Sequence, residues 1–493
     1  MWTKQALHQL IDEKLLGRRL IIVANREPYI HQNVGQRIEC MLPASGMATA
    51  LDPIARACGG VWIAHGSGSA DRATVDERDH VQVPPDAPAY TLRRLWLTKE
   101  QEDDYYYGFS NRGVWPWCHT AFTRPVFDLK HWEAYRQVNE LFAQAVLEEA
   151  DNGPAFVFIQ DYHFALLPRM LRNLSPNLII AQFWHIPWPS PEVFRVCPWG
   201  EEILDGLLGN DLLGFHLRCD CQNFLNTVDR SIESKVDQER SEINRGGRAT
   251  LIRPFPISID FEADSQAARS DEVFVAMERW RQKLGLSDRL LGIGIDRLDY
   301  TKGIPERLQA VDRFLEKYPD YRRRLVFVQI SVPSRSHIPE YHSLDKQVER
   351  LIRQINEKWS ADGWSPIVNL KAHHEQTDMM ALHCLSDFCV VSSLHDGMNL
   401  VAKEYVASRW DEGGMLILSQ FTGAAREFPD ALLVNPYAID QCADAIRQAL
   451  EMPELERRKR MQRMREAVAG NNVYRWAGKI VSALLRFDFP END

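Results

Sequence analysis

The chain lacks the features that would indicate a membrane protein, a secreted protein or a zinc protein. None of its apolar runs approaches the roughly 18 residues that are needed to span a bilayer. Its nine cysteines form no Cys-x-x-Cys pair, which favours free thiols in a reducing compartment. The first 16 residues mix charged and apolar side chains, which is not typical of a signal peptide. We therefore expect a cytoplasmic protein.

Several common ligand-binding motifs are also missing. Gly66-Ser67-Gly68 and Gly292-Ile293-Gly294 each lack the third glycine of a dinucleotide-binding fingerprint, so a tight turn or close packing explains them better. The sequence contains no phosphate-binding loop that ends in Gly-Lys-Ser/Thr, no His-Glu-x-x-His and no Gly-x-Ser-x-Gly. No histidine spacing indicates a metal site. We expect neither a metal nor a cofactor.

The composition is that of a globular protein with two domains. The chain has 493 residues, of which 45% are hydrophobic and 26% are charged. Its net charge is −10, so the surface as a whole repels nucleic acid and anionic membranes. An anionic ligand therefore requires a local cluster of cations.

Short apolar runs alternate with stretches of helical period along the whole chain. Helices are expected over 132–146 and 273–284 and after Asp440. The predicted strands are 20–24, 61–64, 155–159, 178–184, 211–215, 251–252, 290–295, 325–330, 367–370, 388–391, 415–418 and 432–434. Most of these runs lack strict alternation, which is typical of strands buried on both faces of a parallel sheet. The predicted fold class is α/β, with two Rossmann-like domains that face a central cleft.

Pro254-Phe255-Pro256 marks the expected domain boundary, because two prolines stiffen a turn and exclude helix. We predict one domain over residues 1–256 and a second over 257–475, with a final segment, 476–493, that returns to the first. A polar stretch over 258–270 is expected to lead into the first helix of the second domain.

Polar side chains follow four of the predicted strands, where ligands bind in such folds. A charge that is merely solvated would explain any one of them, but four on two sheets favour a binding site. The four segments are Gln160-Asp161-Tyr162-His163, His185-Ile186-Pro187-Trp188, Asp296-Arg297-Leu298-Asp299-Tyr300-Thr301-Lys302-Gly303 and Ser392-Ser393-Leu394-His395-Asp396-Gly397-Met398-Asn399-Leu400.

Arg297 and Lys302 are the centre of the predicted chemistry. Two cations around one strand-end turn can converge on a diphosphate and stabilise the charge that grows on a leaving phosphate. The segment from Asp396 to Val401 precedes a helical stretch, whose free amides would favour an anion. Asp396 and Glu404 are eight positions apart, about two helical turns, so we expect both to face the cleft. An exposed surface helix would explain Glu404 alone.

These segments resemble the trehalose-6-phosphate synthase family, retaining glycosyltransferases with the two-domain GT-B fold. The resemblance extends from Val23-Ala24-Asn25-Arg26 to Val434-Asn435-Pro436-Tyr437. It implies that UDP-glucose is the donor, although the residues do not decide between UDP, ADP and GDP. It also implies a role in trehalose biosynthesis and osmoprotection. A homo-oligomer, either a dimer or a tetramer, is compatible with the sequence, which does not decide the oligomeric state.

The resemblance assigns a role to each candidate residue. Arg297 and Lys302 would hold the donor diphosphate, Asp396 the transferred glucose, His185 the glucosyl ring and Glu404 the ribose. The remaining donor-binding residues would be Gly46, Gly397, Met398, Asn399, Leu400 and Val401, and the acceptor-binding residues would be Arg26, Tyr106, Trp115, Asp161 and Arg335. Arg335 favours glucose 6-phosphate as the acceptor, because the related glucosylglycerol-phosphate synthases lack this arginine.

The chain departs from the family pattern at a few positions. Gln160 replaces a histidine, His395 an arginine and Trp188 a phenylalanine, and Ser45 and Met47 replace glycine and leucine around Gly46. The change at His395 leaves open which nucleotide base the sugar donor carries. No phosphatase motif is present, so the product is expected to remain phosphorylated.

The family is thought to transfer glucose by same-face substitution, in which the leaving phosphate accepts the acceptor's proton. We therefore expect no covalent glucosyl intermediate. Two alternatives use the same residues: transfer to glycerol 3-phosphate, and a pseudoglycosyltransferase that joins cyclitols through nitrogen. A catalytically silent sensor of sugar phosphates is the alternative from another class.

Overall fold

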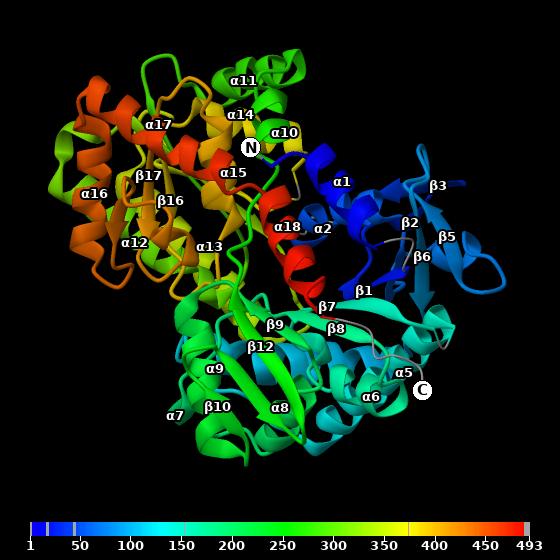
Figure 1. Ribbon diagram of the computed structural model, residues 1–493. Coiled ribbons are helices and arrows are strands. Elements are labelled where there is room, and N and C mark those ends of the chain that lie inside the picture. The colour runs from blue at the N-terminus through cyan, green and yellow to red at the C-terminus, as the bar shows by residue number, and fades with distance from the viewer. Residues whose placement is uncertain (1, 16–18, 43–45, 152, 373, 488–493) are drawn as a thin grey trace. The chain divides into compact units, whose positions relative to one another are not determined.

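The computed structural model describes residues 2–15, 19–42, 46–151, 153–372 and 374–487 (Figure 1). The chain divides into two compact units. Unit 1 comprises Met1–Ile257 and Val473–Asp493, and unit 2 comprises Ser258–Asn472. None of the described helices is long and apolar enough to cross a membrane.

Unit 1 is built on a ten-stranded sheet with the order β10-β11-β12-β9-β8-β7-β1-β4-β6-β5. The seven strands from β12 to β6 are parallel, and β5, β10 and β11 pair antiparallel at the edges. Its strands are β1 (Arg19–Arg26), β4 (Val61–His65), β5 (His80–Val83), β6 (Tyr90–Leu95), β7 (Ala155–Gln160), β8 (Ile179–Phe183), β9 (Leu212–Phe215), β10 (Lys235–Asp237), β11 (Glu242–Arg245) and β12 (Arg248–Pro254). A separate hairpin consists of β2 (Ile30–Val34) and β3 (Arg37–Met41).

The helices of unit 1 connect these strands. They are α1 (Lys4–Leu15), α2 (Gly46–Cys58), α3 (Lys99–Gln101), α4 (Trp115–His119), α5 (Leu129–Ala150), α6 (Leu167–Leu174), α7 (Pro191–Phe194), α8 (Gly200–Leu207), α9 (Arg218–Ser231) and α18 (Val473–Leu484). Short 3-10 turns occur at η1 (Asp71–Ala73) and η3 (Tyr162–Phe164), and η2 (Glu102–Val114) is a π-helix. The C-terminal helix α18 packs beside α1 and α2 (Figure 1).

Unit 2 is a six-stranded, fully parallel sheet with the order β15-β14-β13-β16-β17-β18. Its strands are β13 (Leu290–Arg297), β14 (Leu325–Val332), β15 (Ile367–Leu370), β16 (Phe388–Val391), β17 (Met415–Ser419) and β18 (Leu432–Val434). Its helices are α10 (Phe261–Ala267), α11 (Asp271–Leu284), α12 (Ile304–Lys317), α13 (Pro339–Trp359), α14 (Gln376–Leu385), α15 (Leu400–Ser408), α16 (Ile439–Glu451) and α17 (Glu454–Gly470), with 3-10 turns η4 (Tyr300–Lys302), η5 (Pro319–Tyr321) and η6 (Gly423–Arg426).

The α/β prediction is confirmed, and both units have Rossmann-like parallel sheets. Every predicted strand is present, because a continuous apolar run too short for a helix fits a strand whose two faces are covered. The predicted helices appear as α5, α11 and α16. α11 has Ser270 as its N-cap and Gly285, in the left-handed conformation, as its C-cap.

Two local features differ from the sequence prediction. The polar stretch 258–270 contains the short helix α10, whose first turn is capped by the side chain of Asp260. The strands β5, β10 and β11 at the two margins of the sheet, the β2–β3 hairpin and the inner strand β6 were not predicted. In β6 buried residues alternate with partly exposed ones over most of its length, so it lacks a continuous apolar run. Edge strands bury at most one face, so their sequences lack the apolar runs that identify central strands.

Candidate active site

In unit 2, the candidate residues lie at the carboxyl ends of β13 and β16. From β13 the chain continues to β14 on one side, and it later returns to β16 on the other. Ligands bind at such a switch point in open parallel sheets. Arg297 is the last residue of β13, Lys302 is the last residue of η4, and Asp396 lies in the loop after β16.

Hydrogen bonds tie these two strand ends together. The Leu394 amide donates to the Thr301 carbonyl over 2.7 Å, and the Ser392 hydroxyl donates to the Gly303 carbonyl over 2.8 Å. Gly303 has a φ of +61°, and a Cβ there would lie 2.1 Å from the Ser392 carbonyl oxygen. Only glycine permits this close approach. The turn that carries Lys302 is thereby held against the loop that carries Asp396.

Lys302 and Asp396 form the central ion pair of unit 2. The Lys302 ammonium lies 2.5 Å from Oδ2 of Asp396, and each side chain is 12% exposed. The same carboxylate oxygen accepts hydrogen bonds of 3.1 Å from the Ser393 hydroxyl and the Asn399 amide. Three donors on one oxygen stabilise the carboxylate and orient it, and they reduce its strength as a nucleophile.

The loop after Asp396 presents a row of backbone amides. Within the described residues, the N–H groups of residues 397–401 have no hydrogen-bond acceptor, whereas the next amide, of Ala402, donates to the Asn399 side chain over 3.1 Å. Asn399 is the N-cap of α15 and has a φ of +78°. Free amides at the start of a helix attract an anion. All five predicted positions from Gly397 to Val401 belong to this row.

Glu404 lies on α15, and no side chain among the described residues donates a hydrogen bond to its carboxylate. Burial alone raises the pKa of Glu404 to about 7. The pKa of Asp264, on α10, is also raised, to about 8. Burial is the larger cause, and the nearby charge of Glu404 adds to it. A carboxylate in this situation gains most from a ligand that donates hydrogen bonds.

Arg335 follows β14 in unit 2, where it contacts Asp299 and Tyr341. Its Nη1 lies 3.3 Å from Oδ2 of Asp299 and 2.6 Å from the Tyr341 hydroxyl. Burial would raise the pKa of Asp299, but the charges of Arg335, Arg297 and Lys302 outweigh it and hold that pKa below its ordinary value. The charges of all three cations are thus close enough to Asp299 to stabilise its carboxylate, and Arg335 pairs with it directly.

In unit 1, the candidate residues lie at the carboxyl ends of the neighbouring strands β1, β7 and β8. Arg26 ends β1, Gln160 ends β7 and is followed by Asp161, and His185 comes shortly after β8. Asp161 has a φ of +71°, and its Oδ1 accepts hydrogen bonds from the amides of Tyr162 and His185, over 2.9 Å and 3.2 Å. Asp161 thus joins the ends of β7 and β8.

His185 is a neutral imidazole. Burial, with contributions from the nearby His216 and His163, lowers its pKa well below the ordinary value. Its Nε2 lies 3.0 Å from Oε1 of Gln160, a contact in which a proton on Nε2 would be donated to the amide oxygen. The departure from the family pattern at position 160 therefore replaces a titratable neighbour of His185 with a neutral amide.

Tyr106 connects Arg26 to this group. Nη2 of Arg26 donates to the Tyr106 hydroxyl over 3.0 Å, and the Tyr106 ring stacks on His163 at 5.7 Å. Tyr106 belongs to the π-helix η2, an uncommon element that is frequent at functional sites. Trp115 begins the next helix, α4, and its ring lies 5.9 Å from that of Tyr162. Four predicted acceptor-binding residues are therefore connected within unit 1, whereas Arg335 belongs to unit 2.

The remaining predicted positions are only partly described. Gly46 is the first residue of α2, and Ser45 lies outside the described residues. Trp188 is buried, and its indole nitrogen lies 3.2 Å from the Thr227 hydroxyl. In the part of the chain that the structure describes, no group of three or more His, Cys, Asp or Glu side chains is placed to hold a metal.

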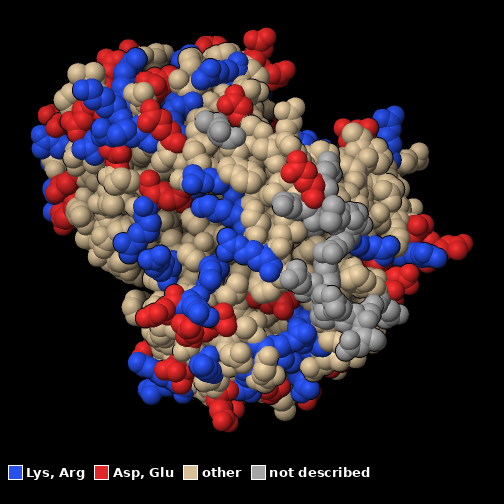
Figure 2. Space-filling view, viewed as in Figure 1, with Lys and Arg blue, Asp and Glu red and all other residues tan. Residues whose placement is uncertain are grey.

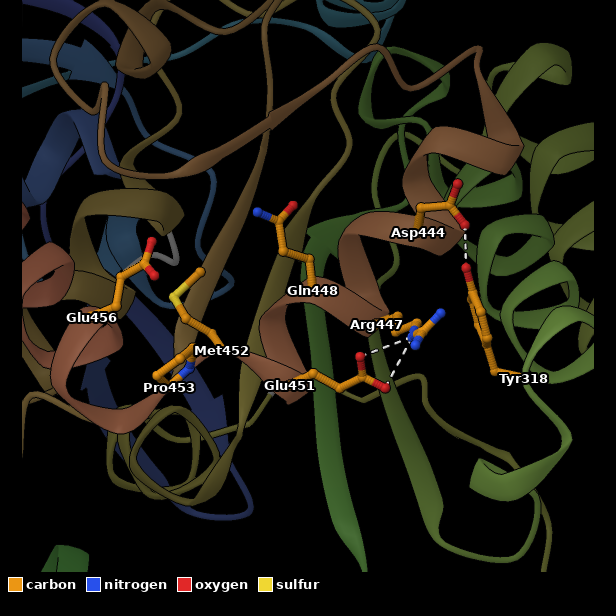
Figure 3. Close-up of a pocket in the computed structure, with 8 residues that line it drawn as sticks. All are labelled: Tyr318, Asp444, Arg447, Gln448, Glu451, Met452, Pro453 and Glu456. Atoms are coloured by element: carbon orange, nitrogen blue, oxygen red, sulfur yellow. Dashed lines mark hydrogen bonds and ion pairs between the residues drawn. The ribbon is translucent and has the colours of Figure 1, made fainter.

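Acidic and basic side chains are interspersed over the face shown in Figure 2 and form no single large patch. A hollow on unit 2 is lined by Tyr318, Asp444, Arg447 and Glu451, among others (Figure 3). Its charged groups already have partners: Arg447 pairs with Glu451 at 2.9 Å, and Asp444 pairs with Lys317 at 2.5 Å and accepts a hydrogen bond from the Tyr318 hydroxyl. The hollow lies at the ends of α12 and α16, which is the opposite edge of the sheet from Lys302. It carries no candidate residue.

One spacing argument is wrong. α15 begins at Leu400, so Asp396 is not on the helix that carries Glu404, and the helical period does not relate the two. The Asp396 amide instead donates to the Phe421 carbonyl, which anchors the loop beside β17.

Sequence reasoning also missed Asp299, His163 and Asp264. Asp299 lies inside a conspicuous motif, but Asp264 lies in a stretch with no signal.

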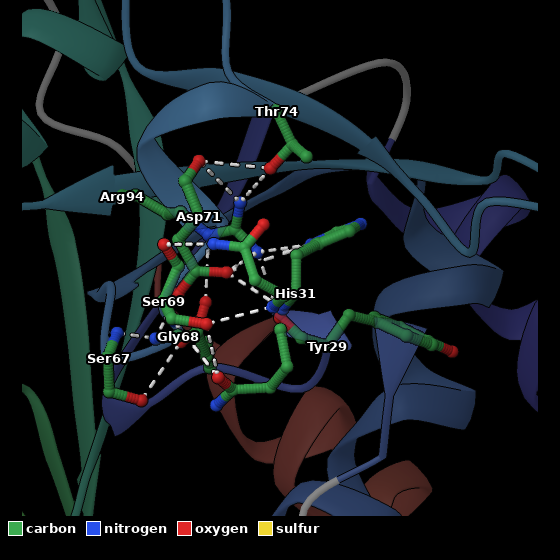
Figure 4. Close-up of polar contacts among 11 residues, drawn as sticks. Tyr29, His31, Ser67, Gly68, Ser69, Asp71, Thr74 and Arg94 are labelled. Atoms are coloured by element: carbon green, nitrogen blue, oxygen red, sulfur yellow. Dashed lines mark hydrogen bonds and ion pairs between the residues drawn. The ribbon is translucent and has the colours of Figure 1, made fainter. Parts of the chain in front are cut away.

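Glu27, next to Arg26, is a buried acid that sequence reasoning left unassigned. Burial and a hydrogen bond with Asp71 raise its pKa from 4.5 to about 8, despite the positive charge of Arg94. Arg94 also contacts Asp71, Thr74, Tyr29 and His31 (Figure 4). Glu27 therefore remains protonated at neutral pH in the folded chain.

Unit 1 is expected to lose stability as the pH rises from about 5 to above 8. The unfolded chain releases the Glu27 proton near pH 4.5, whereas the folded chain keeps it to about pH 8, so this contribution to stability disappears as the pH rises through 8. Urea unfolding at pH 5.5 and pH 8.5, followed by tryptophan fluorescence, measures the loss. The Glu27→Gln variant should lose less, and an equal loss in both proteins would contradict the assignment.

Comparisons with known proteins agree on one family. The family model described as "Glycosyltransferase family 20" matches residues 18–486. A trehalose-6-phosphate synthase of Mycolicibacterium vanbaalenii is 38% identical over 476 residues, which cover 95% of this chain and 96% of the relative. A UDP-forming α,α-trehalose-phosphate synthase from Burkholderia xenovorans, solved in complex with glucose 6-phosphate, has a TM-score of 0.85 with 31% identity and covers 94% of this chain and 100% of its own. A trehalose-6-phosphate synthase structure from a study of glycosyl transfer with retention has a TM-score of 0.84 with 30% identity, over 95% and 99% of the two chains.

Proposed function

The chain belongs to glycosyltransferase family 20, and we propose that it transfers glucose from UDP-glucose to glucose 6-phosphate with retention, forming α,α-trehalose 6-phosphate. The relative from Mycolicibacterium vanbaalenii is described as a trehalose-6-phosphate synthase, and the one from Burkholderia xenovorans as a UDP-forming synthase in complex with glucose 6-phosphate. Within this chain, the proposal depends on a single arrangement, which is the set of cations and free amides at the carboxyl ends of β13 and β16.

That arrangement suits a sugar diphosphate. The amides of residues 397–401 supply hydrogen bonds to phosphate oxygens, while Arg297 and Lys302 supply positive charge from the facing turn. Charge grows on the departing phosphate as the sugar–oxygen bond breaks, and preorganised donors stabilise that charge most in the transition state. The two cations and the backbone amides can therefore stabilise the charge on the departing phosphate.

Glu404 is assigned to the ribose of the donor. Its carboxylate lies on α15, the helix whose first turn contains the free amides, so a nucleotide bound there places its ribose along the same helix. Two ribose hydroxyls would supply the hydrogen bonds that the described residues do not provide to this carboxylate.

The acceptor is assigned to Arg26, Tyr106, Trp115 and Asp161 of unit 1, with Arg335 of unit 2. A forked guanidinium is the usual partner of a phosphate monoester, and Arg26 is already oriented by the Tyr106 hydroxyl. Asp161 and the neutral His185 offer acceptors for sugar hydroxyls. His185 is assigned to the transferred glucosyl ring.

We assign no covalent step to Asp396. Its carboxylate already accepts hydrogen bonds from Lys302, Ser393 and Asn399, so it is suited to orient a sugar hydroxyl and poorly suited to attack the anomeric carbon. The acceptor hydroxyl would attack from the face that the phosphate leaves, and its proton would pass to the departing phosphate oxygen. The configuration of the anomeric carbon is then retained.

The proposal is tested by incubating the protein with UDP-, ADP- or GDP-glucose and a panel of acceptors: glucose 6-phosphate, glycerol 3-phosphate, a phosphorylated aminocyclitol and glucose. Mass spectrometry identifies the product, and NMR gives the configuration of the new bond. We expect α,α-trehalose 6-phosphate from UDP-glucose and glucose 6-phosphate. A faster reaction with another acceptor would replace the proposed substrate, and no nucleotide release with any pair would support a silent sensor.

A further inference from the structure

The end of strand β1 needs support that the sheet itself does not provide. β1 pairs regularly with β7 only as far as Val23, which faces Ile159. On its other side the register with β4 shifts between Val23 and Arg26. Such a bulge re-aims the side chains that follow it and interrupts the ladder. Beyond the shift Arg26 still pairs with His65 of β4, but the described pairing with β7 has ended, so the strand end gains from a further anchor.

Glu27 provides one such anchor. Its Oε1 accepts hydrogen bonds from the amide and the hydroxyl of Ser67, over 2.9 Å and 3.1 Å, and its Oε2 accepts one from Nε of Arg94 over 2.8 Å. Glu27 is 1% exposed and Arg94 is fully buried. The residue that follows Arg26 is thus tied both to the loop after β4 and to β6.

Arg94 extends the anchor to the rest of the segment. Its Nη2 donates to the Tyr29 carbonyl over 3.0 Å and lies 2.9 Å from Oδ1 of Asp71, and its Nη1 donates to the Thr74 hydroxyl over 2.9 Å (Figure 4). Asp71 in turn accepts from the amide of His31. Nearly every donor of one guanidinium is therefore used to join the chain after β1 to the turn at η1.

The loop after β4 is shaped for this arrangement. The Gly68 amide donates to Oδ2 of Asp71 over 2.6 Å, and a Cβ at Gly68 would lie 2.3 Å from the His31 carbonyl oxygen. The amides of Ser67 and Gly68 are thus occupied by two acidic side chains of the chain itself, those of Glu27 and Asp71. This explains why the Gly66-Ser67-Gly68 sequence is not a nucleotide-binding loop.

We propose that Glu27, Asp71 and Arg94, the Arg94 cluster, are positioning residues that hold Arg26 for the phosphate of the acceptor. The inference rests on the function proposed above. None of the three side chains is more than 1% exposed, so they act through Arg26 and do not touch the substrate. Arg26 in turn donates to Tyr106, so displacement of the segment disturbs both groups at once.

The test is Arg94→Lys, which keeps a positive charge but loses the forked set of donors. We expect the KM for glucose 6-phosphate to rise about 10-fold or more, because a displaced arginine loses its paired bonds to phosphate. The kcat and the KM for UDP-glucose should stay within about twofold of the wild-type values, since the donor-binding amides belong to unit 2.

Arg172→Lys is the matched control. Arg172 is also a buried arginine of unit 1, with Nη2 2.6 Å from Oδ2 of Asp211 and further hydrogen bonds to the carbonyls of Gly209, Pro176 and Leu178. Asp211 precedes β9, at the amino edge of the sheet. This variant should lower the melting temperature as Arg94→Lys does, but leave the KM for glucose 6-phosphate unchanged.

The inference would be overturned if Arg94→Lys and Arg172→Lys changed the KM for glucose 6-phosphate equally. It would also be overturned if Arg94→Lys raised the KM values for glucose 6-phosphate and UDP-glucose in parallel. If Arg94→Lys does not fold, Glu27→Ala is measured in the same way, and an unchanged KM for glucose 6-phosphate overturns the inference. Failure of the proposed function would look different, because the wild-type protein would then form no trehalose 6-phosphate at all.

Discussion

Replacing Arg297 with alanine is expected to lower kcat about 10²- to 10³-fold, with a smaller rise in the KM for the donor. Arg297 is the last residue of β13, and its charge, like that of Lys302, acts on Asp299. In the proposed mechanism its guanidinium stabilises the charge that develops on the leaving phosphate. Because this charge is larger in the transition state than in the bound donor, its loss affects turnover more than binding. Initial rates of UDP release with saturating glucose 6-phosphate measure the effect.

Arg289→Ala is the control for Arg297. Arg289 precedes the same strand at its amino end, so its loss changes the net charge equally but leaves the carboxyl edge intact. We expect a nearly normal kcat. Arg297→Lys should be intermediate, because an ammonium provides charge without the fork. Near-normal turnover in Arg297→Ala, or a glucosyl group trapped on Asp396 or Glu404, would refute the proposed mechanism.

Donor binding is expected to strengthen about 10-fold as the pH rises from 6 to 8. The pKa of Glu404 is raised to about 7 by burial, so its carboxyl is mostly protonated at pH 6 and mostly ionised at pH 8. The ionised form accepts two hydrogen bonds from the ribose hydroxyls, whereas the neutral form competes as a donor. Titration calorimetry with UDP-glucose at pH 6, 7 and 8 measures the dissociation constants.

Two variants isolate Glu404 from its acidic neighbour. In Glu404→Gln the side chain does not titrate, so affinity for UDP-glucose should be weaker and nearly independent of pH. Asp264→Asn removes the other carboxyl with a raised pKa, of about 8, and should keep the pH dependence. If the pH dependence of UDP-glucose affinity persists in Glu404→Gln and disappears in Asp264→Asn, Asp264 is the titrating group and not Glu404.

The central strands and their polar ends were predictable for a local reason. A strand covered on both faces needs a continuous apolar run, and the first polar residue after that run marks the carboxyl edge of the sheet. Arg297, Asp161 and His185 were all found in this way, and the structure places each at such an edge. The motif from Arg297 to Gly303 and the one from Asp396 to Val406 identified the family.

Pairings between distant segments were not predictable. The Arg94 cluster joins residues 67 positions apart, and nothing near Glu27 in the chain indicates that its carboxyl is buried against Arg94. The electrostatic effect of Glu404 on Asp264 and the ion pair of Arg335 with Asp299 also join segments that are far apart in the sequence. The π-helix η2 also has no sequence rule, because its hydrogen-bond pattern depends on the packing of its aromatic residues against α5.

The sequence by itself determined the α/β class, most of the parallel strands, the family and which polar residues follow those strands, since each of these depends on local patterns of apolar and polar residues. Only the tertiary structure decided which of those residues meet, how the pKa values of Glu404 and His185 are shifted, and which side chains surround Arg94. The reason is physical: desolvation, charge coupling and hydrogen bonding act through space, and the chain brings these partners together only when the sheets have formed.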